Sequence, residues 1–188
     1  MQAVRDGDVA KLGPLFERYH VPLFDFLSRM TGNRTAAEDL VQDVFVRMLK
    51  YRATFRDDGQ FETWMFRIAR NARADYFRSR SAIDQVSDEG IDAPADDPGP
   101  ARLLEQERDA VLLRRALMML REDRRELIVL TRYRGLKHAA IAEILGIDVG
   151  TVKVRIHRAM KELREIYLGL TRNQPWNAGT SPRNLRIT

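Results

Sequence analysis

The 188-residue chain contains no cysteine and only three histidines. Without cysteine it forms neither disulfides nor thiolate metal sites, and it has no thiol nucleophile. His20, His138 and His157 are not spaced four apart, so they do not form a two-histidine metal motif on one helix. No apolar run approaches the roughly 18 residues of a membrane helix, and the N-terminus has no signal-peptide pattern. We expect a cytoplasmic protein with no membrane insertion, no metal and no cofactor.

Charge is distributed unevenly along the chain, whose net charge is +5 and whose pI is about 9.8. Residues 1–80 hold 14 basic and 11 acidic residues, whereas residues 81–100 hold six acidic and no basic residues. Residues 110–168 hold 13 basic and seven acidic residues. Many soluble proteins are mildly basic, but two basic blocks around an acidic strip also suit a polyanionic partner such as nucleic acid.

The acidic strip, SAIDQVSDEGIDAPADDPGP, divides the chain. It cannot bury enough apolar surface to order itself, which predicts a flexible linker over 81–100 between domains at 1–80 and 101–168. Residues 169–188 are predicted to form a flexible tail. Both blocks lack period-two alternation and contain few internal Gly or Pro residues. We therefore expect an all-α fold of two small helical domains joined by a flexible acidic linker.

Two helices are predicted in the second half of the first block. A capping box from Thr35 to Glu38 predicts a helix that begins at Ala36 and runs to about Tyr51. The next helix spans about 61–79, and opposite its apolar face lies a basic stripe with Asp75 at its margin. The stripe comprises Arg67, Arg70, Asn71, Ala74 and Arg78.

The basic stripe of helix 61–79 has two explanations. A solvated charged face is usual for any helix. However, the loop before it places Tyr51 and Phe55 beside Arg52 and Arg56. Aromatic rings interleaved with arginines are suited to stacking on unpaired bases while neutralising the nucleic-acid backbone.

Residues 138–157, HAAIAEILGIDVGTVKVRIH, have the spacing of a helix-turn-helix. Ala142 is the small residue where the helices cross, Gly146 permits the positive φ of the turn, and Asp148 is placed to cap the second helix. The second helix begins with small residues and then exposes basic ones, so it can approach base edges and phosphates closely. An ordinary helical hairpin with a basic face is the alternative, and the spacing favours a DNA-binding unit.

Three passages together resemble a bacterial RNA polymerase sigma factor of the extracytoplasmic-function type, group IV of the sigma-70 family. AEDLVQDVFVRMLK (37–50) resembles the polymerase-binding helix of sigma region 2, and FETWMFRIARNARADYFRSR (61–80) resembles the helix that melts the promoter and recognises its −10 element. LREDRRELIVLTRYRGLKHAAIAEILGIDVGTVKVRIHRAMKELRE (120–165) resembles sigma region 4, which reads the −35 element. The resemblance covers about residues 8–168.

The resemblance implies a non-enzymatic factor that binds core RNA polymerase, directs it to promoter DNA and helps melt the −10 region, with no small-molecule substrate. It also implies an anti-sigma partner. The residues matching the polymerase contact are Asp39, Gln42, Asp43, Val46 and Arg47. Those matching the −10 contact are Arg67, Arg70, Asn71, Asp75 and Arg78, and the loop 51–60 would hold a flipped base. The −35 set is Thr151, Lys153, Val154, Arg155, His157 and Arg158, with Val154 where relatives often carry Ser.

Other functions remain open from sequence. A sigma-like decoy that binds an anti-sigma factor but not DNA would lose the basic stripes, and a helix-turn-helix repressor would need a dimerisation helix or ligand pocket. A nuclease would need more carboxylates beside Asp57 and Asp58. Arg121 replaces a proline that commonly starts the region-4 helix, where Glu122 or Asp123 would cap instead. The linker acids at 84–97 are hypothesised to cover the basic stripes in the free protein.

Overall fold

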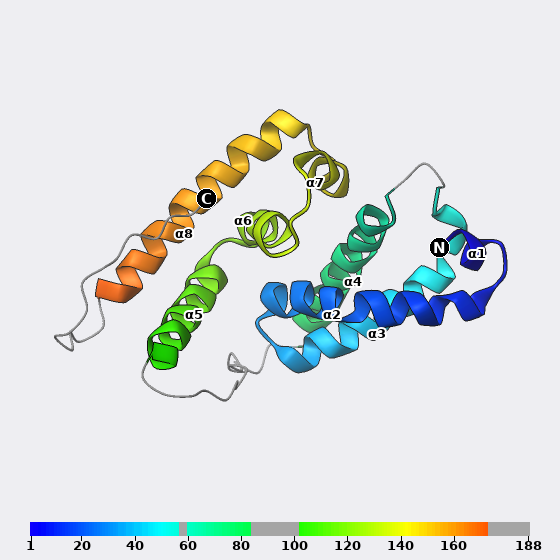
Figure 1. Cartoon of the computed structure of the whole chain (residues 1–188), viewed down its shortest axis with the longest axis horizontal. Coiled ribbons are helices and arrows are strands. Elements are labelled where there is room, and N and C mark those ends of the chain that lie inside the picture. Colours follow the sequence, from blue (N-terminus) through cyan, green and yellow to red (C-terminus); the bar gives the residue numbers. More distant parts are fainter. Residues whose placement is uncertain (57–59, 84–101, 173–188) are drawn as a thin grey trace.

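The computed structural model describes residues 1–56, 60–83 and 102–172, and every regular element in these ranges is helical (Figure 1). This confirms the predicted all-α class. The first half contains α1 (Gln2–Arg5), η1 (Val9–Lys11), α2 (Leu12–Thr31), α3 (Arg34–Lys50), η2 (Arg52–Thr54) and α4 (Phe61–Ile83). The second half contains α5 (Arg102–Met119), α6 (Glu122–Ile128), the π-helical turn η3 (Val129–Tyr133), α7 (His138–Leu145) and α8 (Val149–Arg172).

Helices α2, α3 and α4 pack together because each presents an apolar face to the other two. Phe26 of α2 meets Phe66 of α4 edge-on, with ring centroids 5.2 Å apart. The fully buried side chains around them include Leu23, Leu27, Met30, Leu40, Met48 and Met65. This shared core fixes the position of the outward face of α3 relative to that of α4.

The start of α3 differs from the prediction of a capping box at Thr35. Gly32 ends α2 at φ +71°, and Asn33, in an extended conformation, is the N-cap of α3. The Asn33 side-chain oxygen accepts a hydrogen bond from the Ala36 amide at 2.8 Å. Glu38 pairs with Arg34 instead of closing a box with Thr35. The predicted capping box was wrong because Asn33, two residues before Thr35, already caps the first turn of the helix.

Helices α7 and α8 form the predicted helix-turn-helix. Gly146 ends α7 at φ +68°, where a side chain would be strained. Asp148 caps α8 by accepting the Thr151 amide proton at 2.8 Å. Ile141 and Val152 are fully buried between the two helices and their neighbours. The orientation of α8 relative to α7 therefore follows from the glycine turn, the aspartate cap and the buried apolar contact between the two helices.

The start of α6 lacks the predicted acidic cap. Arg121 occupies the N-cap position and no side chain makes a capping hydrogen bond. Asp123 pairs with Arg121, with its carboxylate oxygen 3.4 Å from Nε. Glu122 turns instead towards Arg73 of α4. The expectation that Glu122 or Asp123 would cap this helix was therefore wrong.

The two halves of the chain lie against each other. Helices α2 and α4 contact α5, α6, η3 and α7, and their buried residues join one continuous apolar cluster. Helix α4 runs to Ile83 and α8 to Arg172, past the predicted starts of the linker and the tail. The remainder of both segments, the hypothesised linker contacts, and Asp57 and Asp58 lie outside the described residues. Among the described helices, none is long and apolar enough to span a bilayer.

Candidate nucleic-acid interface

The outward face of α3 gathers the residues expected to contact polymerase. Asp39, Gln42 and Val46 are exposed, and Asp43 and Arg47 are half-buried beside them. Val46 is 65% exposed and adds an apolar side chain to this otherwise polar face. A small apolar centre with charged and amide neighbours is the composition of a modest protein-binding surface.

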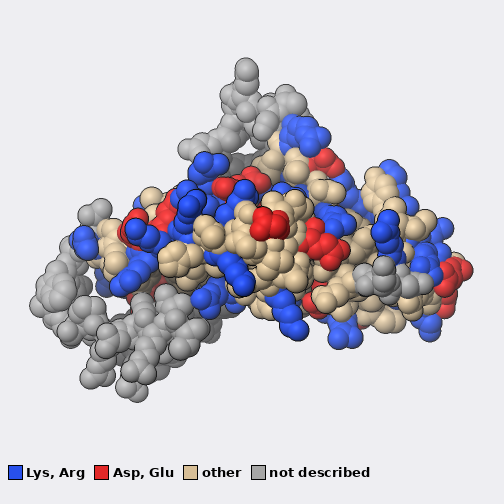
Figure 2. Space-filling view, turned by 90° about the horizontal axis from the view of Figure 1, so that it is seen from above, with Lys and Arg blue, Asp and Glu red and all other residues tan. Residues whose placement is uncertain are grey.

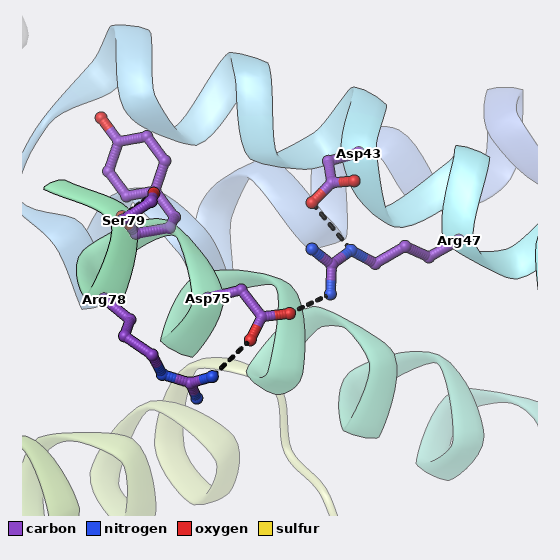
Figure 3. A network of polar contacts seen from close by, with 6 residues as sticks. Asp43, Arg47, Asp75, Arg78 and Ser79 are labelled. Atoms are coloured by element: carbon purple, nitrogen blue, oxygen red, sulfur yellow. Dashed lines mark hydrogen bonds and ion pairs between the residues drawn. The ribbon is translucent and has the colours of Figure 1, made fainter. Parts of the chain in front are cut away.

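Arg47 links the α3 face to α4, as Figure 3 shows. Its Nε lies 2.9 Å from Asp43, and its Nη1 donates to Asp75 of α4 at 2.5 Å. The hydrogen bond from Arg47 lowers the pKa of Asp75, and the same bond raises the pKa of Arg47. Arg78 also approaches the Asp75 carboxylate, at 3.4 Å. Asp75, expected to contact DNA, therefore has its carboxylate shared between two arginines.

We expect Asp75→Asn to act through Arg47. The pair is partly exposed and screened by solvent, so the free energy of unfolding should change little. Any loss of polymerase affinity should vanish when Arg47 is already alanine, because the carboxylate then has nothing to position. A double-mutant cycle on polymerase affinity measures this coupling. Additive effects of the two substitutions would show that Asp75 acts on its own.

A pocket of about 350 Å³ opens between α3 and α4. It is lined by Arg47, Tyr51, Ile68, Asn71, Ala74, Asp75 and Arg78. Tyr51 is 43% exposed and offers an aromatic ring, Asn71 offers an amide, and the arginines offer positive charge. These are the groups that take up an unpaired base and its phosphate.

The other aromatic residues of this region are less available. Phe55 is 7% exposed and packs edge-on against Trp64, with ring centroids 5.4 Å apart. The prediction that Phe55 stacks on a base was therefore wrong, because its ring belongs to the core. Trp64 is half-buried, and its Nε1 donates to Thr54 Oγ1 at 3.2 Å. Tyr51 is left as the accessible ring of the described part of the loop.

Part of the arginine stripe of α4 contacts the second half of the chain. Arg67 Nη2 donates to the backbone carbonyl of Glu143 on α7 at 2.9 Å. Arg70 Nε donates to the Glu126 carboxylate of α6 at 3.2 Å. Two of the five residues expected at the −10 element are thus engaged by the second half of the chain.

Arg73 extends this row and was missed in the sequence analysis. It is 3% exposed and pairs with Glu122 at the start of α6. It lies two helical turns after the buried Phe66, so spacing alone could have placed it on a second contact face of α4.

Glu126 is the buried carboxylate of this contact, with 4% of the residue exposed. Burial raises its pKa, and the charges of Arg70 and Arg73 only partly offset that effect, while Glu122 adds to it. For a carboxylate in this position, the free-energy cost of desolvation exceeds the favourable interaction with the two arginines. The contact therefore carries a penalty at neutral pH.

Glu126→Gln tests that penalty. Because the pKa of Glu126 is raised in the folded protein, the folded state binds a proton at this carboxyl more tightly than the unfolded chain does. Protonated Glu126 therefore contributes to stability at low pH, and that contribution is lost as the pH rises through the raised pKa. Relative to the parent chain, the free energy of unfolding of E126Q should increase as the pH is raised from about 5 to about 8. Urea unfolding at several pH values measures the difference. A difference that does not vary with pH would contradict the assignment.

Most of the predicted −35 set on α8 is exposed to solvent. The exposed members of the predicted −35 set are Lys153, Val154, Arg155, His157 and Arg158. Thr151 is half-buried, and its hydroxyl bonds the Asp148 carboxylate, which lowers the pKa of Asp148. Figure 2 shows Lys and Arg spread over the visible face with carboxylates among them, rather than one continuous basic field.

Comparisons with known proteins agree with this arrangement. The Sigma-70 region 2 family model matches residues 15–83, and the Sigma-70, region 4 model matches residues 110–163. The chain is 31% identical over 169 residues to the RNA polymerase sigma factor CarQ of Myxococcus xanthus, covering 88% of this chain and 94% of that protein. It is 32% identical over 173 residues to the ECF RNA polymerase sigma factor SigL of Mycobacterium tuberculosis, covering 88% and 95%.

Two solved structures share the fold. One is the sigma factor RpoE in complex with the anti-sigma factor NepR from Bartonella quintana, with a TM-score of 0.69 and 26% identity, covering 87% of this chain and 99% of that chain. The other is CnrH in complex with the cytosolic domain of CnrY, with a TM-score of 0.66 and 28% identity, covering 92% and 96%.

Proposed function

The chain belongs to the extracytoplasmic-function group of sigma-70 family RNA polymerase sigma factors, and from that membership we propose which of its surfaces performs each step of promoter recognition. The observation that carries the proposal is the presence of regions 2 and 4, in this order, in one chain with an exposed recognition helix. As a sigma factor, it directs core RNA polymerase to promoters. We propose domain limits of 1–80 and 101–168, joined by a linker at 81–100 and followed by a tail at 169–188.

Helix α3 supplies the polymerase contact in this proposal. Val46 is exposed on the same face of α3 as Asp39 and Gln42, and Arg47 lies beside it. An apolar centre excludes water, and the charged neighbours set orientation and partner choice. Arg47 is held by Asp43 and Asp75, which fixes the position of its guanidinium before any partner arrives.

Helix α4 and the pocket beside it supply the −10 contact. Arg67, Arg70 and Arg78 would neutralise phosphates of the unpaired strand, and Asn71 and Tyr51 would contact its bases. Extruding a base costs a few kcal/mol, which stacking on Tyr51 and the pocket contacts offset. Melting requires no hydrolysis, because a surface that binds the single strand better than the duplex shifts the equilibrium towards strand separation.

Helix α8 supplies the −35 contact. Lys153, Arg155 and Arg158 project from its solvent-facing side, where they can reach phosphates or the acceptor edge of guanine. Val154 offers a methyl surface that suits a thymine methyl group. His157 lies on the same exposed side and completes the contact set.

Promoter selection follows from holding both contacts on one scaffold. Each small domain alone presents few contacts, but on the polymerase the second contact becomes intramolecular and gains from effective concentration. Only promoters with the correct spacing between the elements benefit. We also propose an anti-sigma partner for this chain, because the similar structure of RpoE contains the anti-sigma factor NepR and that of CnrH contains the cytosolic domain of CnrY. We further propose that the chain is not an enzyme and acts in the cytoplasm.

Binding experiments with purified components test the proposal. The chain should co-elute with bacterial core polymerase, and the complex should retain promoter fragments that neither component retains alone. Binding to core without DNA retention would favour a sigma-like decoy. DNA binding without any association with core would favour a helix-turn-helix regulator.

A further inference from the structure

The N-terminal helix α1 lies before the part of the chain that matches the region 2 family model, which begins at residue 15. We propose that α1 holds the η2 turn in place, with Arg5 as a positioning residue that keeps the Tyr51 ring where it can stack on an unpaired base of the −10 strand. This inference rests on the proposed role of Tyr51 at the −10 contact. It gives a part in DNA binding to a segment that the family model does not include.

Helix α1 is anchored to the rest of region 2 by a buried side chain and a tight turn. Val4 is fully buried, and Met1 packs against the apolar core, whereas Gln2 and Ala3 are exposed. Gly7 has a φ of +113°, which side chains rarely allow, and the chain turns there from α1 into η1. A helix of four residues does not form by itself in water, so α1 exists because of these contacts.

Arg5 connects α1 to the η2 turn. Its Nη1 donates to the backbone carbonyl of Phe55 at 3.5 Å, and its Nε is held by the Asp6 carboxylate at 3.0 Å. Phe55 is the C-cap of η2, where backbone carbonyls lack partners inside the helix and attract positive charge. Helix α1 also packs against η2 along the chain. The guanidinium therefore fixes the point at which the backbone leaves the turn.

The η2 turn is held on another side by α4. Thr54 Oγ1 donates to the Tyr51 carbonyl at 2.8 Å and accepts a hydrogen bond from Trp64 Nε1 at 3.2 Å. The Phe55 ring packs edge-on against the same indole, with ring centroids 5.4 Å apart. The backbone of Tyr51 is thus tied through the turn to α4 by Trp64 and to α1 by the hydrogen bond at Phe55.

A fixed turn matters because Tyr51 is the accessible ring beside the pocket between α3 and α4. It is exposed and lines that pocket, whereas Phe55 is buried. An aromatic ring that is already oriented binds a base without a further cost for ordering the backbone that carries it. Release of α1 restores that cost and should weaken binding of unpaired DNA. Arg5 acts in this way through the backbone of Phe55 rather than by touching DNA.

The test uses the full-length chain and three variants that each lower the net charge by one. Arg5→Ala removes the donor, Val4→Asp forces a charge into the buried anchor of α1, and Lys11→Ala removes an exposed charge outside the contact as the control. Fluorescence anisotropy of a labelled single-stranded oligonucleotide of mixed sequence measures affinity. Arg5→Ala and Val4→Asp should each bind at least about threefold more weakly than Lys11→Ala, because part of a stacking contact is lost. Equal affinities of all three variants would overturn the proposal.

A double-mutant cycle with Tyr51→Ala separates positioning from a general structural effect. When Tyr51 is already alanine, the affinities of Arg5→Ala and Lys11→Ala should differ by less than about 1.5-fold, since no ring is left to position. A difference as large as in the parent background would contradict the positioning role. Urea unfolding of Arg5→Ala and Lys11→Ala should give the same midpoint, because the hydrogen bond to Phe55 is long and weak. A lower midpoint for Arg5→Ala would attribute the loss to stability instead.

Quenching of Trp64 fluorescence by acrylamide reports on the turn without DNA. Trp64 packs against Phe55, and Trp176→Phe leaves it as the sole tryptophan of the chain. In this background the two α1 variants should each increase quenching relative to the lysine control, because a released turn uncovers the indole. Unchanged quenching would overturn the proposal. If quenching increases but Tyr51→Ala alone does not weaken DNA binding, α1 holds the turn and the proposed role of Tyr51 at the −10 contact fails, so the two failures are distinguishable.

Discussion

Val46→Arg is expected to reduce the affinity of the chain for core polymerase by at least tenfold. Val46 lies on the outward face of α3 and is 65% exposed, so the substitution changes the surface without opening a cavity. A charge forced into the apolar centre of an interface loses its hydration without gaining a partner. A tenfold loss corresponds to about 1.4 kcal/mol of binding free energy.

The fold should tolerate Val46→Arg, because arginine has a higher helix propensity than valine and surface substitutions change stability by less than about 0.5 kcal/mol. Val111→Arg on α5, where the valine is 48% exposed, introduces the same side chain away from α3. Titration of fluorescent protein with core polymerase measures both affinities. If Val111→Arg weakens binding as much as Val46→Arg, the α3 face is not the polymerase contact.

Lys153→Ala combined with Arg155→Ala should reduce promoter binding by the polymerase complex at least tenfold. Both side chains are exposed on α8, and alanine preserves the helix. If both contact phosphates, the slope of log affinity against log salt should become shallower by about 2. If one reads a base, the loss should be larger on the cognate −35 element than on a scrambled one.

A matched pair on the same helix provides the control for α8. Lys161→Ala with Arg164→Ala removes the same charge from exposed positions further along the helix. This pair should change affinity and salt slope much less. Fluorescence anisotropy on a promoter fragment at several salt concentrations compares the two variants. Equal losses would mean that α8 contributes only general positive charge rather than a positioned contact.

The local elements of this structure were predictable from sequence because short-range chemistry determines them. Gly146 and Asp148 define the turn of the helix-turn-helix, and both behave as expected. Helical periodicity likewise separated the buried face of α4 from its arginine stripe. The start of α3 was predicted two residues too late, because Asn33 and Thr35 are both good cap residues and only the extended backbone of Asn33 decides between them.

The partners of the arginine stripe were not predictable in the same way. Arg67 and Glu143 are 76 residues apart, and Arg70 and Glu126 are 56 apart. Periodicity identifies a face of a helix, but it does not indicate which segment of the chain covers that face. The linker acids at 84–97, hypothesised to cover the stripe, lie outside the described residues, and the described contacts come from glutamates inside region 4.

The aromatic residues near the −10 contact illustrate the same limit. Tyr51 and Phe55 both follow α3 and looked equivalent as stacking platforms. In the structure Phe55 is covered by Phe61 and Trp64, and Tyr51 lines the open pocket. Which ring is buried depends on the path of the backbone through η2, and a sequence pattern does not specify that path. The exact contacts of the predicted site residues with polymerase and DNA therefore stay predictions.

Run-off transcription with purified bacterial core polymerase, on a pool of genomic fragments, tests the central claim most directly. The account predicts discrete transcripts that appear only when the chain is added, with shared sequence elements upstream of their start points. It also predicts that these transcripts disappear with Val46→Arg and persist with Val111→Arg. Transcripts that are the same with and without the chain, although it binds core polymerase, would contradict the claim that it directs promoter recognition.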